Sequence, residues 1–166
     1  MASSRPRLFP KLPSSNRDGN HSVSAIRVLV VEDFEPFRRF ISSTLGKRPE
    51  LHVICEVSDG VEAIHQAEEL HPDLIVLDIG LPKLNGIEAA RQIRKLSPGS
   101  KIIFLTQESS AGVIQEALRL GPVGYVVKTF ARSKLLTAVD AVLQGKRFVS
   151  CGLASHDTNE TVVADR

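Results

Sequence analysis

Polar side chains stand at the ends of four of the five apolar runs in this sequence. Glu32 and Asp33 end the first run, Asp78 the third, Thr106 the fourth and Lys128 the fifth. If the runs are strands of one parallel sheet, their carboxyl ends share an edge, and open α/β folds bind their ligands at that edge. The pattern therefore predicts a crevice with three carboxylates, one hydroxyl and one ammonium group.

Three carboxylates in one crevice repel one another unless a cation joins them. An all-oxygen ligand set suits Mg²⁺, with Mn²⁺ as an alternative. Such a cation keeps several waters and also binds phosphate oxygens, so Asp78 is positioned to attack phosphorus and form an aspartyl phosphate. Thr106 would then donate a hydrogen bond to one phosphoryl oxygen, and Lys128 would neutralise another.

Each of these residues alone has a plainer structural explanation. An acidic residue at a strand end commonly caps a turn or a helix. A lone threonine there is an ordinary strand-end hydroxyl, and a lone lysine is usually solvated on the surface. The functional hypothesis therefore rests on their joint placement.

The elements that would position these residues alternate between strand and helix. The expected strands are 26–31, 52–57, 74–77, 101–106 and 124–128, and the expected helices are one from about Pro36 to Leu45, then 61–70, 85–96, 109–120 and 131–143. Such alternation predicts a parallel sheet with helices on both faces. We therefore expect an α/β, flavodoxin-like, doubly wound (βα)5 fold, with a five-stranded parallel sheet in the order 2-1-3-4-5.

Composition suits one globular domain with residues to spare at both ends. The chain has 166 residues, of which 42% are hydrophobic and 24% charged. We expect a disordered leader at 1–25, rich in Ser, Pro, Arg and Asn, the domain at 26–149, and a flexible C-terminal tail at 150–166. The net charge of +2 gives no case for nucleic-acid binding.

Cysteine usage and hydropathy suggest a compartment. Cys55 and Cys151 share no metal-ligand spacing, and a buried free thiol with an incidental tail thiol fits a reducing cytoplasm. No apolar run approaches the roughly 20 residues that cross a bilayer, so we expect a cytoplasmic protein with no membrane partner. The basic, acid-poor leader shares its composition with organelle transit peptides but lacks their amphipathic periodicity.

Several motifs together resemble the receiver domain of two-component response regulators, from about Arg27 to about Phe148. The matching segments are Val30-Val31-Glu32-Asp33, Asp78-Ile79-Gly80-Leu81-Pro82 with Asn85-Gly86, Leu105-Thr106, and Tyr125-Val126-Val127-Lys128. Each motif is weak alone, and the combination is highly specific.

The resemblance assigns roles to individual residues. It implies that Asp78 is the phosphoacceptor, and that Glu32, Asp33 and Asp78 form an acidic Mg²⁺ pocket with the backbone carbonyl of Gly80 as a further ligand. Magnesium is the implied cofactor of this pocket.

The same resemblance implies a switch. Thr106 and Lys128 would sense the phosphoryl group, and Tyr125 would be the switch aromatic, whose ring turns inward when Thr106 moves to the phosphate. The structural alternative for Tyr125 is a half-buried residue at the edge of the sheet.

A phosphohistidine donor is implied, either a sensor histidine kinase or a histidine phosphotransfer protein. Phosphorylation would switch the face formed by 109–120, 124–128 and 131–143 for binding an output protein or for forming a homodimer. The protein would accept phosphate, with autodephosphorylation at most, and would not be a turnover enzyme.

Asp78–Pro82 and Gly145–Ser150 are most similar to the NarL/FixJ branch of this family, in which the second motif leads into a helix-turn-helix domain. Only 16 residues follow Ser150, too few for such a domain. We therefore expect no DNA-binding domain in this chain, which leaves a stand-alone receiver or a truncated receiver of a DNA-binding transcriptional regulator.

Three residues depart from the family pattern or tune it. Gln107 stands where the family usually has a small residue, and its long side chain could slow the entry of a donor or of attacking water. Gly80 and Glu108 lie at positions that tune the phosphoryl lifetime, so the resemblance does not give that lifetime.

Two other functional classes would need residues that this sequence does not have at the expected positions. A Mg²⁺-dependent phosphohydrolase of the haloacid dehalogenase type, working through an aspartyl phosphate, would have a second Asp two residues after the nucleophile, and Gly80 stands there instead. A nucleotide-binding α/β protein would have a glycine-rich loop after the first strand. Residues 32–36 contain no glycine, and their acids would repel phosphates.

Overall fold

The computed structural model describes residues 5–10, 24–107, 110–121 and 123–150, together with the backbone of 161–164. Its eight strands form one sheet in the order β1-β3-β2-β4-β5-β6-β7-β8. The strands are β1 (Arg7–Leu8), β2 (Ile26–Val31), β3 (Leu51–Val57), β4 (Leu74–Asp78), β5 (Lys101–Thr106), β6 (Gly124–Val127), β7 (Lys146–Ser150) and β8 (Thr161–Ala164). The helices are α1 (Glu35–Leu45), α2 (Gly60–Leu70), α3 (Gly86–Leu96), α4 (Ala111–Leu118), the 3-10 turn η1 (Lys128–Phe130) and α5 (Ala131–Leu143).

The five strands expected from the sequence are β2 to β6, and neighbours among them pair in parallel. The sheet extends beyond them. On one side β1 pairs antiparallel with β3, and on the other β7 pairs in parallel with β6 and antiparallel with β8. The sheet is therefore mostly parallel, and the expectation of five parallel strands was too narrow.

The added strands lie at the expected domain boundaries. β1 falls within the expected leader, β7 crosses the expected boundary at 149–150, and β8 falls within the expected tail. Residues 1–4, 11–23, 151–160 and 165–166 lie outside the described part of the chain, so disorder of the leader and flexibility of the tail stay predictions for them. Segments of two to five residues are too short to show a periodic pattern. Their backbone partners are also distant in sequence, so the sequence did not predict these strands.

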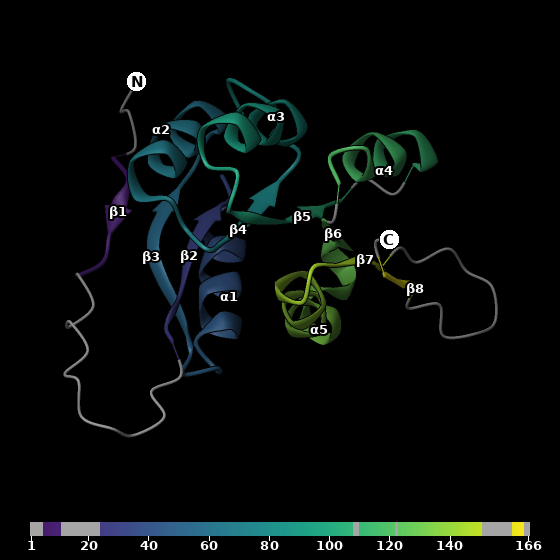
Figure 1. Ribbon diagram of the computed structural model, residues 1–166. Helices are drawn as coiled ribbons and strands as arrows, with labels where there is room; N and C mark the ends of the chain where they lie inside the picture. Colours follow the sequence, from purple (N-terminus) through teal and green to yellow (C-terminus); the bar gives the residue numbers. More distant parts are fainter. Residues whose placement is uncertain (1–4, 11–23, 108–109, 122, 151–160, 165–166) are drawn as a thin grey trace.

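Helices cover both faces of the central strands (Figure 1), and apolar residues alternate between these faces. In β2, Leu29 and Val31 join the cluster under α2 and α3, whereas Val28 and Val30 join the cluster under α1 and α5. Because both faces are covered, these strands are apolar over most of their length. Among the described residues, no helix has the length and apolar character that a membrane span requires.

Cys55 lies in the core and is a free thiol, as expected. Burial, with smaller contributions from nearby glutamates, raises the pKa of this thiol to about 12. A thiol with such a pKa is almost wholly protonated near neutral pH, so Cys55 is a packing residue. Cys151 lies outside the described residues.

The turn between β4 and α3 is packed against the backbone that carries Asp78. Gly86 N donates to Ile79 O at 2.8 Å, and Asn85 Oδ1 accepts a hydrogen bond from Glu88 N at 3.0 Å, which caps α3. A Cβ at Gly86 would lie 2.1 Å from the Asp78 carbonyl oxygen. Glycine is therefore required at this position for α3 to approach the end of β4.

We expect Gly86→Ala to destabilise the fold by about 3 kcal/mol, because the added methyl forces the Asp78 backbone to shift. Urea denaturation measures this change. Gly99→Ala is the matched control, since nothing lies within 4 Å of a Cβ at Gly99. Equal stability of the two variants would contradict this account of the turn.

Candidate functional site

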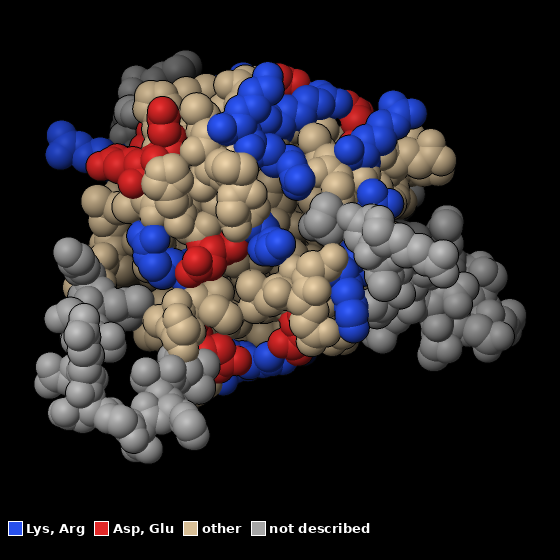
Figure 2. Space-filling view, in the orientation of Figure 1, with Lys and Arg blue, Asp and Glu red and all other residues tan. Residues whose placement is uncertain are grey.

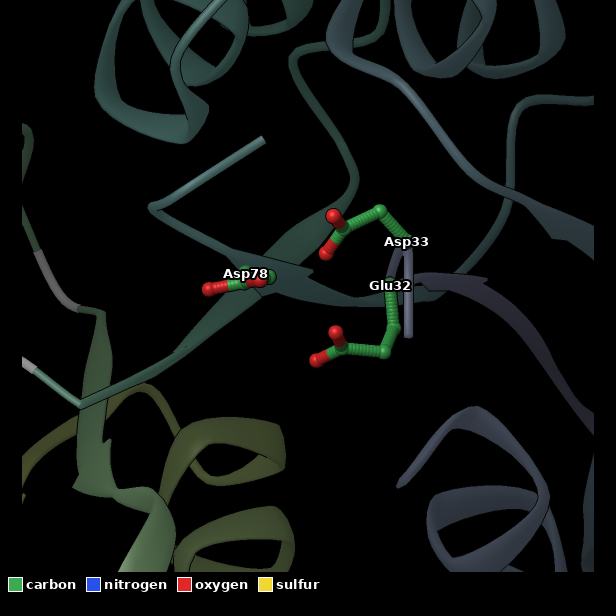
Figure 3. A group of neighbouring side chains, drawn as sticks. All are labelled: Glu32, Asp33 and Asp78. Atoms are coloured by element: carbon green, nitrogen blue, oxygen red, sulfur yellow. The ribbon is translucent and has the colours of Figure 1, made fainter. Parts of the chain in front are cut away.

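Three carboxylates meet at the carboxyl edge of the sheet (Figure 3). Glu32 and Asp33 directly follow β2, and Asp78 ends β4, its neighbour in the sheet. Each side chain offers one oxygen, and these three oxygens lie within 4.8 Å of one another. Glu32 and Asp78 are buried, whereas Asp33 is exposed, so the group opens to solvent on the Asp33 side.

Lys128, the residue after β6, brings its ammonium group to two of these carboxylates. Its Nζ lies 2.8 Å from Glu32 Oε2 and donates to Asp78 Oδ2 at 3.2 Å. The same Nζ lies 4.9 Å from the centroid of the Phe37 ring. This aromatic contact, from the first turns of α1, was not anticipated, because Phe37 fits the apolar stripe of that helix.

Burial has opposite effects on the two partners of this ion pair. For Glu32, burial raises the pKa of the carboxyl group, and the negative charge of Asp78 raises it further. The hydrogen bond to Lys128 lowers this pKa, but the net shift is upward. Burial alone would lower the pKa of Lys128, but the hydrogen bond and charge of Glu32 and Asp78 outweigh it and raise that pKa. Lys128 is therefore firmly cationic.

The site has room for a further cation. One ammonium faces three carboxylates, which leaves the group negatively charged if all are ionised. Glu32 Oε2 is buried, and the ammonium group of Lys128 lies 2.8 Å from it. An acidic, all-oxygen pocket in which three carboxylates face one ammonium group fits a hard divalent cation.

The remaining expected site residues line the same pocket, of about 950 Å³. Thr106, at the end of β5, is buried, and Gln107 beside it is exposed. Gly80 is exposed, and its N–H donates to Asp78 Oδ1 at 3.1 Å. Glu108 lies outside the described residues. The structure thus brings Glu32, Asp33, Asp78, Gly80, Thr106, Gln107 and Lys128 to one pocket.

Tyr125 lies beside this pocket, in β6. It pairs with Phe104 of β5 and, on its other side, with Val149 of β7. Its side chain is fully buried. The alternative of a half-buried edge residue is therefore wrong, because β7 covers the edge of β6.

One contact of the site lies outside its side-chain cluster. Arg38, in α1, donates from its guanidinium to the Glu32 carbonyl oxygen at 2.7 Å. The bond ties α1 to the end of β2 and so restrains the backbone that carries Glu32 and Asp33. A sequence signal for it is weak, since an arginine on a helix is usually solvated.

Comparison with known proteins agrees with this geometry. Residues 28–140 match the family described as the response regulator receiver domain. The transcriptional regulatory protein DegU of Brevibacillus brevis is 31% identical over 124 residues, which cover 75% of this chain and 52% of that protein. The chemotaxis protein CheY of Thermotoga maritima is 33% identical, over 70% of this chain and 96% of that protein.

A solved structure of a response regulator is also similar to this chain. The two-component response regulator of the LuxR family from Aurantimonas sp. SI85-9A1 superposes with a TM-score of 0.71 at 31% identity, covering 78% of this chain and 91% of that one. DegU is longer, and the alignment spans about half of it (52%). The likeness therefore concerns the receiver portion of such regulators.

We expect Mg²⁺ to stabilise the fold, because it relieves repulsion among the carboxylates. Binding at about 100 times the Kd adds about 2.7 kcal/mol. Thermal unfolding with and without MgCl₂ measures the effect. Asp33→Asn should lose most of it, and Asp140→Asn, a carboxylate paired with Arg48 away from the pocket, should retain it. An equal stabilisation of Asp33→Asn would exclude this site.

Proposed function

Because the chain belongs to the response regulator receiver domain family, whose members are phosphoacceptor modules of two-component signalling, we propose that Asp78 is its phosphoacceptor. The observation that carries the proposal is the contact of Asp78 with Lys128 inside a cluster of three carboxylates. A buried carboxylate with one oxygen on an ammonium group and the other on the Gly80 N–H is held in a fixed orientation. Fixed orientation is what an in-line attack on phosphorus needs.

The donor is a phosphohistidine of a sensor histidine kinase or of a histidine phosphotransfer protein. An Asp78 oxygen bonds to phosphorus while the phosphorus–nitrogen bond breaks, and the electron pair of that bond leaves with the imidazole. Lys128 neutralises the charge that builds up on the phosphoryl oxygens, and Thr106 donates a hydrogen bond to one of them.

Glu32, Asp33 and Asp78, with the Gly80 carbonyl, are the proposed ligands of Mg²⁺, and Mn²⁺ suits the same oxygens. When bound, the cation supplies positive charge against the phosphoryl oxygens. Glu32 and Asp33 keep the pocket anionic enough to attract it.

The output is a change of the face formed by α4, β6 and α5. Thr106 moves toward the phosphoryl group, and the buried ring of Tyr125 in the neighbouring strand β6 changes its position with it. The changed face binds an output protein or a second copy of the chain. We propose that the protein acts in the cytoplasm as a switch and not as a turnover enzyme.

The alternative of a phosphohydrolase is not favoured, because the family match is to receivers and Gly80 occupies the position of the second aspartate that such an enzyme would have. A truncated receiver of a DNA-binding regulator remains consistent with the likeness to DegU. It shares the phosphoacceptor chemistry and differs in output.

We expect acetyl phosphate with Mg²⁺ to add one phosphoryl group to the protein, seen as one added mass by intact-mass spectrometry. Asp78→Asn removes the nucleophilic oxygen and should abolish this labelling. Asp140→Asn, which also loses one carboxylate, should label as the unchanged protein does. Full labelling of Asp78→Asn would refute the assignment.

Gln107 gives a second prediction, because it is exposed at the mouth of the same pocket. We expect Gln107→Ala to shorten the lifetime of the phosphorylated protein several-fold, since a shorter side chain lets water approach phosphorus. Loss of the added mass over time measures that lifetime. Gln144→Ala, an exposed position at the end of α5, is the control, and an unchanged lifetime for Gln107→Ala would count against the role of this side chain.

A further inference from the structure

Strand β7 is an integral part of the sheet, although it lies beyond residues 28–140, the part that matches the family. It pairs in parallel with β6, from Gly124 opposite Phe148 to Val126 opposite Ser150. Phe148 is buried in the cluster under α1 and α5, and Val149 packs against the cluster on the opposite face. β7 therefore occupies the β6 edge of the proposed output face.

Arg147 links this strand to α4. Its Nε donates to Gly121 O at 3.2 Å, and its Nη2 donates to Leu118 O at 3.1 Å. Leu118 is the last residue of α4. Carbonyls at a helix C-terminus have no partner within the helix, and a cation there is favoured by the helix dipole. The guanidinium thus holds the carbonyl end of α4 against β7.

α4 is shallowly buried, with Val113, Ile114 and Leu118 packed against the cluster under α2 and α3. Within this helix only Ala117 is fully buried. The ion pair of Glu116 with Arg91 of α3, at 2.7 Å, is solvent-exposed, and such pairs contribute little. Figure 2 shows basic side chains gathered over α3 and α4. The Arg147 bonds therefore add to this apolar contact and fix the carbonyl end of α4.

Strand β7 contacts two parts of the proposed switch, namely α4 and the strand that carries Tyr125. Thr106 and Val113 of α4 line the same pocket, so a movement of Thr106 acts next to that helix. Tyr125 is directly opposite Val149 in the β6–β7 ladder. β7 thus touches α4 through Arg147 and touches the switch aromatic through the backbone.

We propose that the docking of β7 on β6 is coupled to phosphorylation of Asp78, so that the phosphorylated protein releases β7. The inference rests on the proposed function. The two Arg147 bonds require α4 and β7 to hold the positions seen here. When Thr106 draws α4 toward the phosphoryl group, these directional bonds lengthen and β7 loses stability. By linkage, docked β7 opposes the phosphorylated arrangement to the same extent.

Hydrogen exchange in the 166-residue chain tests the coupling. The probe is the Phe148 amide, which donates to Val123 O at 3.3 Å across the β6–β7 pair. NMR-detected exchange is compared in Mg²⁺ with and without beryllofluoride, a mimic of the phosphoryl group. We expect beryllofluoride to speed exchange at Phe148 by about fivefold or more, in line with usual coupling energies, while β2 and β4 stay protected.

The outcomes separate the two claims. A bound beryllofluoride signal in the fluorine spectrum that is absent from Asp78→Asn supports the phosphoacceptor. If that signal is present and exchange at Phe148 is unchanged or slower, the coupling is wrong and the proposed function stands. If no beryllofluoride binds, the proposed function fails and the coupling fails with it.

Variants of one strand sharpen the test. Arg147→Met removes both bonds to α4, so we expect faster exchange at Phe148 without beryllofluoride, a smaller change on adding it, and tighter beryllofluoride binding. Arg147→Lys keeps a cation that can donate to these carbonyls, so its exchange rate at Phe148 should lie between those of Arg147→Met and the unchanged protein. Lys146→Met loses a cation from the same strand but no described bond to α4, and it should match the unchanged protein. If beryllofluoride speeds exchange at Phe148 as much in a folded Arg147→Met protein as in the unchanged protein, the role of Arg147 is wrong.

Discussion

The ammonium group of Lys128, shared between Glu32 and Asp78, is the interaction on which the site depends. Burying Glu32 and Asp78 without a cation would be costly, because each carboxylate loses its hydration and repels the other. Lys128 follows β6, whereas the two carboxylates end β2 and β4. The ion pairs can therefore form only if the strands are parallel and their carboxyl ends share one edge, which ties the sheet topology to the chemistry.

Close packing of the backbone supports this edge from behind. α3 begins at Gly86, in contact with the carbonyl of Asp78, so the turn after β4 has little freedom to move. Arg38 restrains the end of β2 from the other face through the Glu32 carbonyl. The carboxylates are thus held on a rigid base, while Asp33 and Gln107 face solvent, where the proposed cation and donor protein would enter.

Helix α4, which contributes Val113 to the same pocket, is attached differently. α4 is short and shallowly buried, and polar bonds from β7 and α3 add to the packing of Val113, Ile114 and Leu118 on the core. Polar bonds at the surface are directional and individually weak, so a small displacement breaks them. The contrast between the rigid edge at Asp78 and the shallowly buried α4 fits the proposed two-state switch.

The sequence by itself determined the central strands, most helix ends to within two residues, and the meeting of Glu32, Asp33, Asp78, Thr106 and Lys128, because apolar runs ending in polar residues have one reading in a parallel sheet. Only the tertiary structure decided the rest. Sharing of Lys128 by two carboxylates, the exposure of Asp33 beside the buried Glu32, and the full burial of Tyr125 depend on neighbours distant in the chain. β1, β7 and β8 are likewise defined by backbone pairing with remote strands, and segments of two to five residues carry no periodic signal of that pairing.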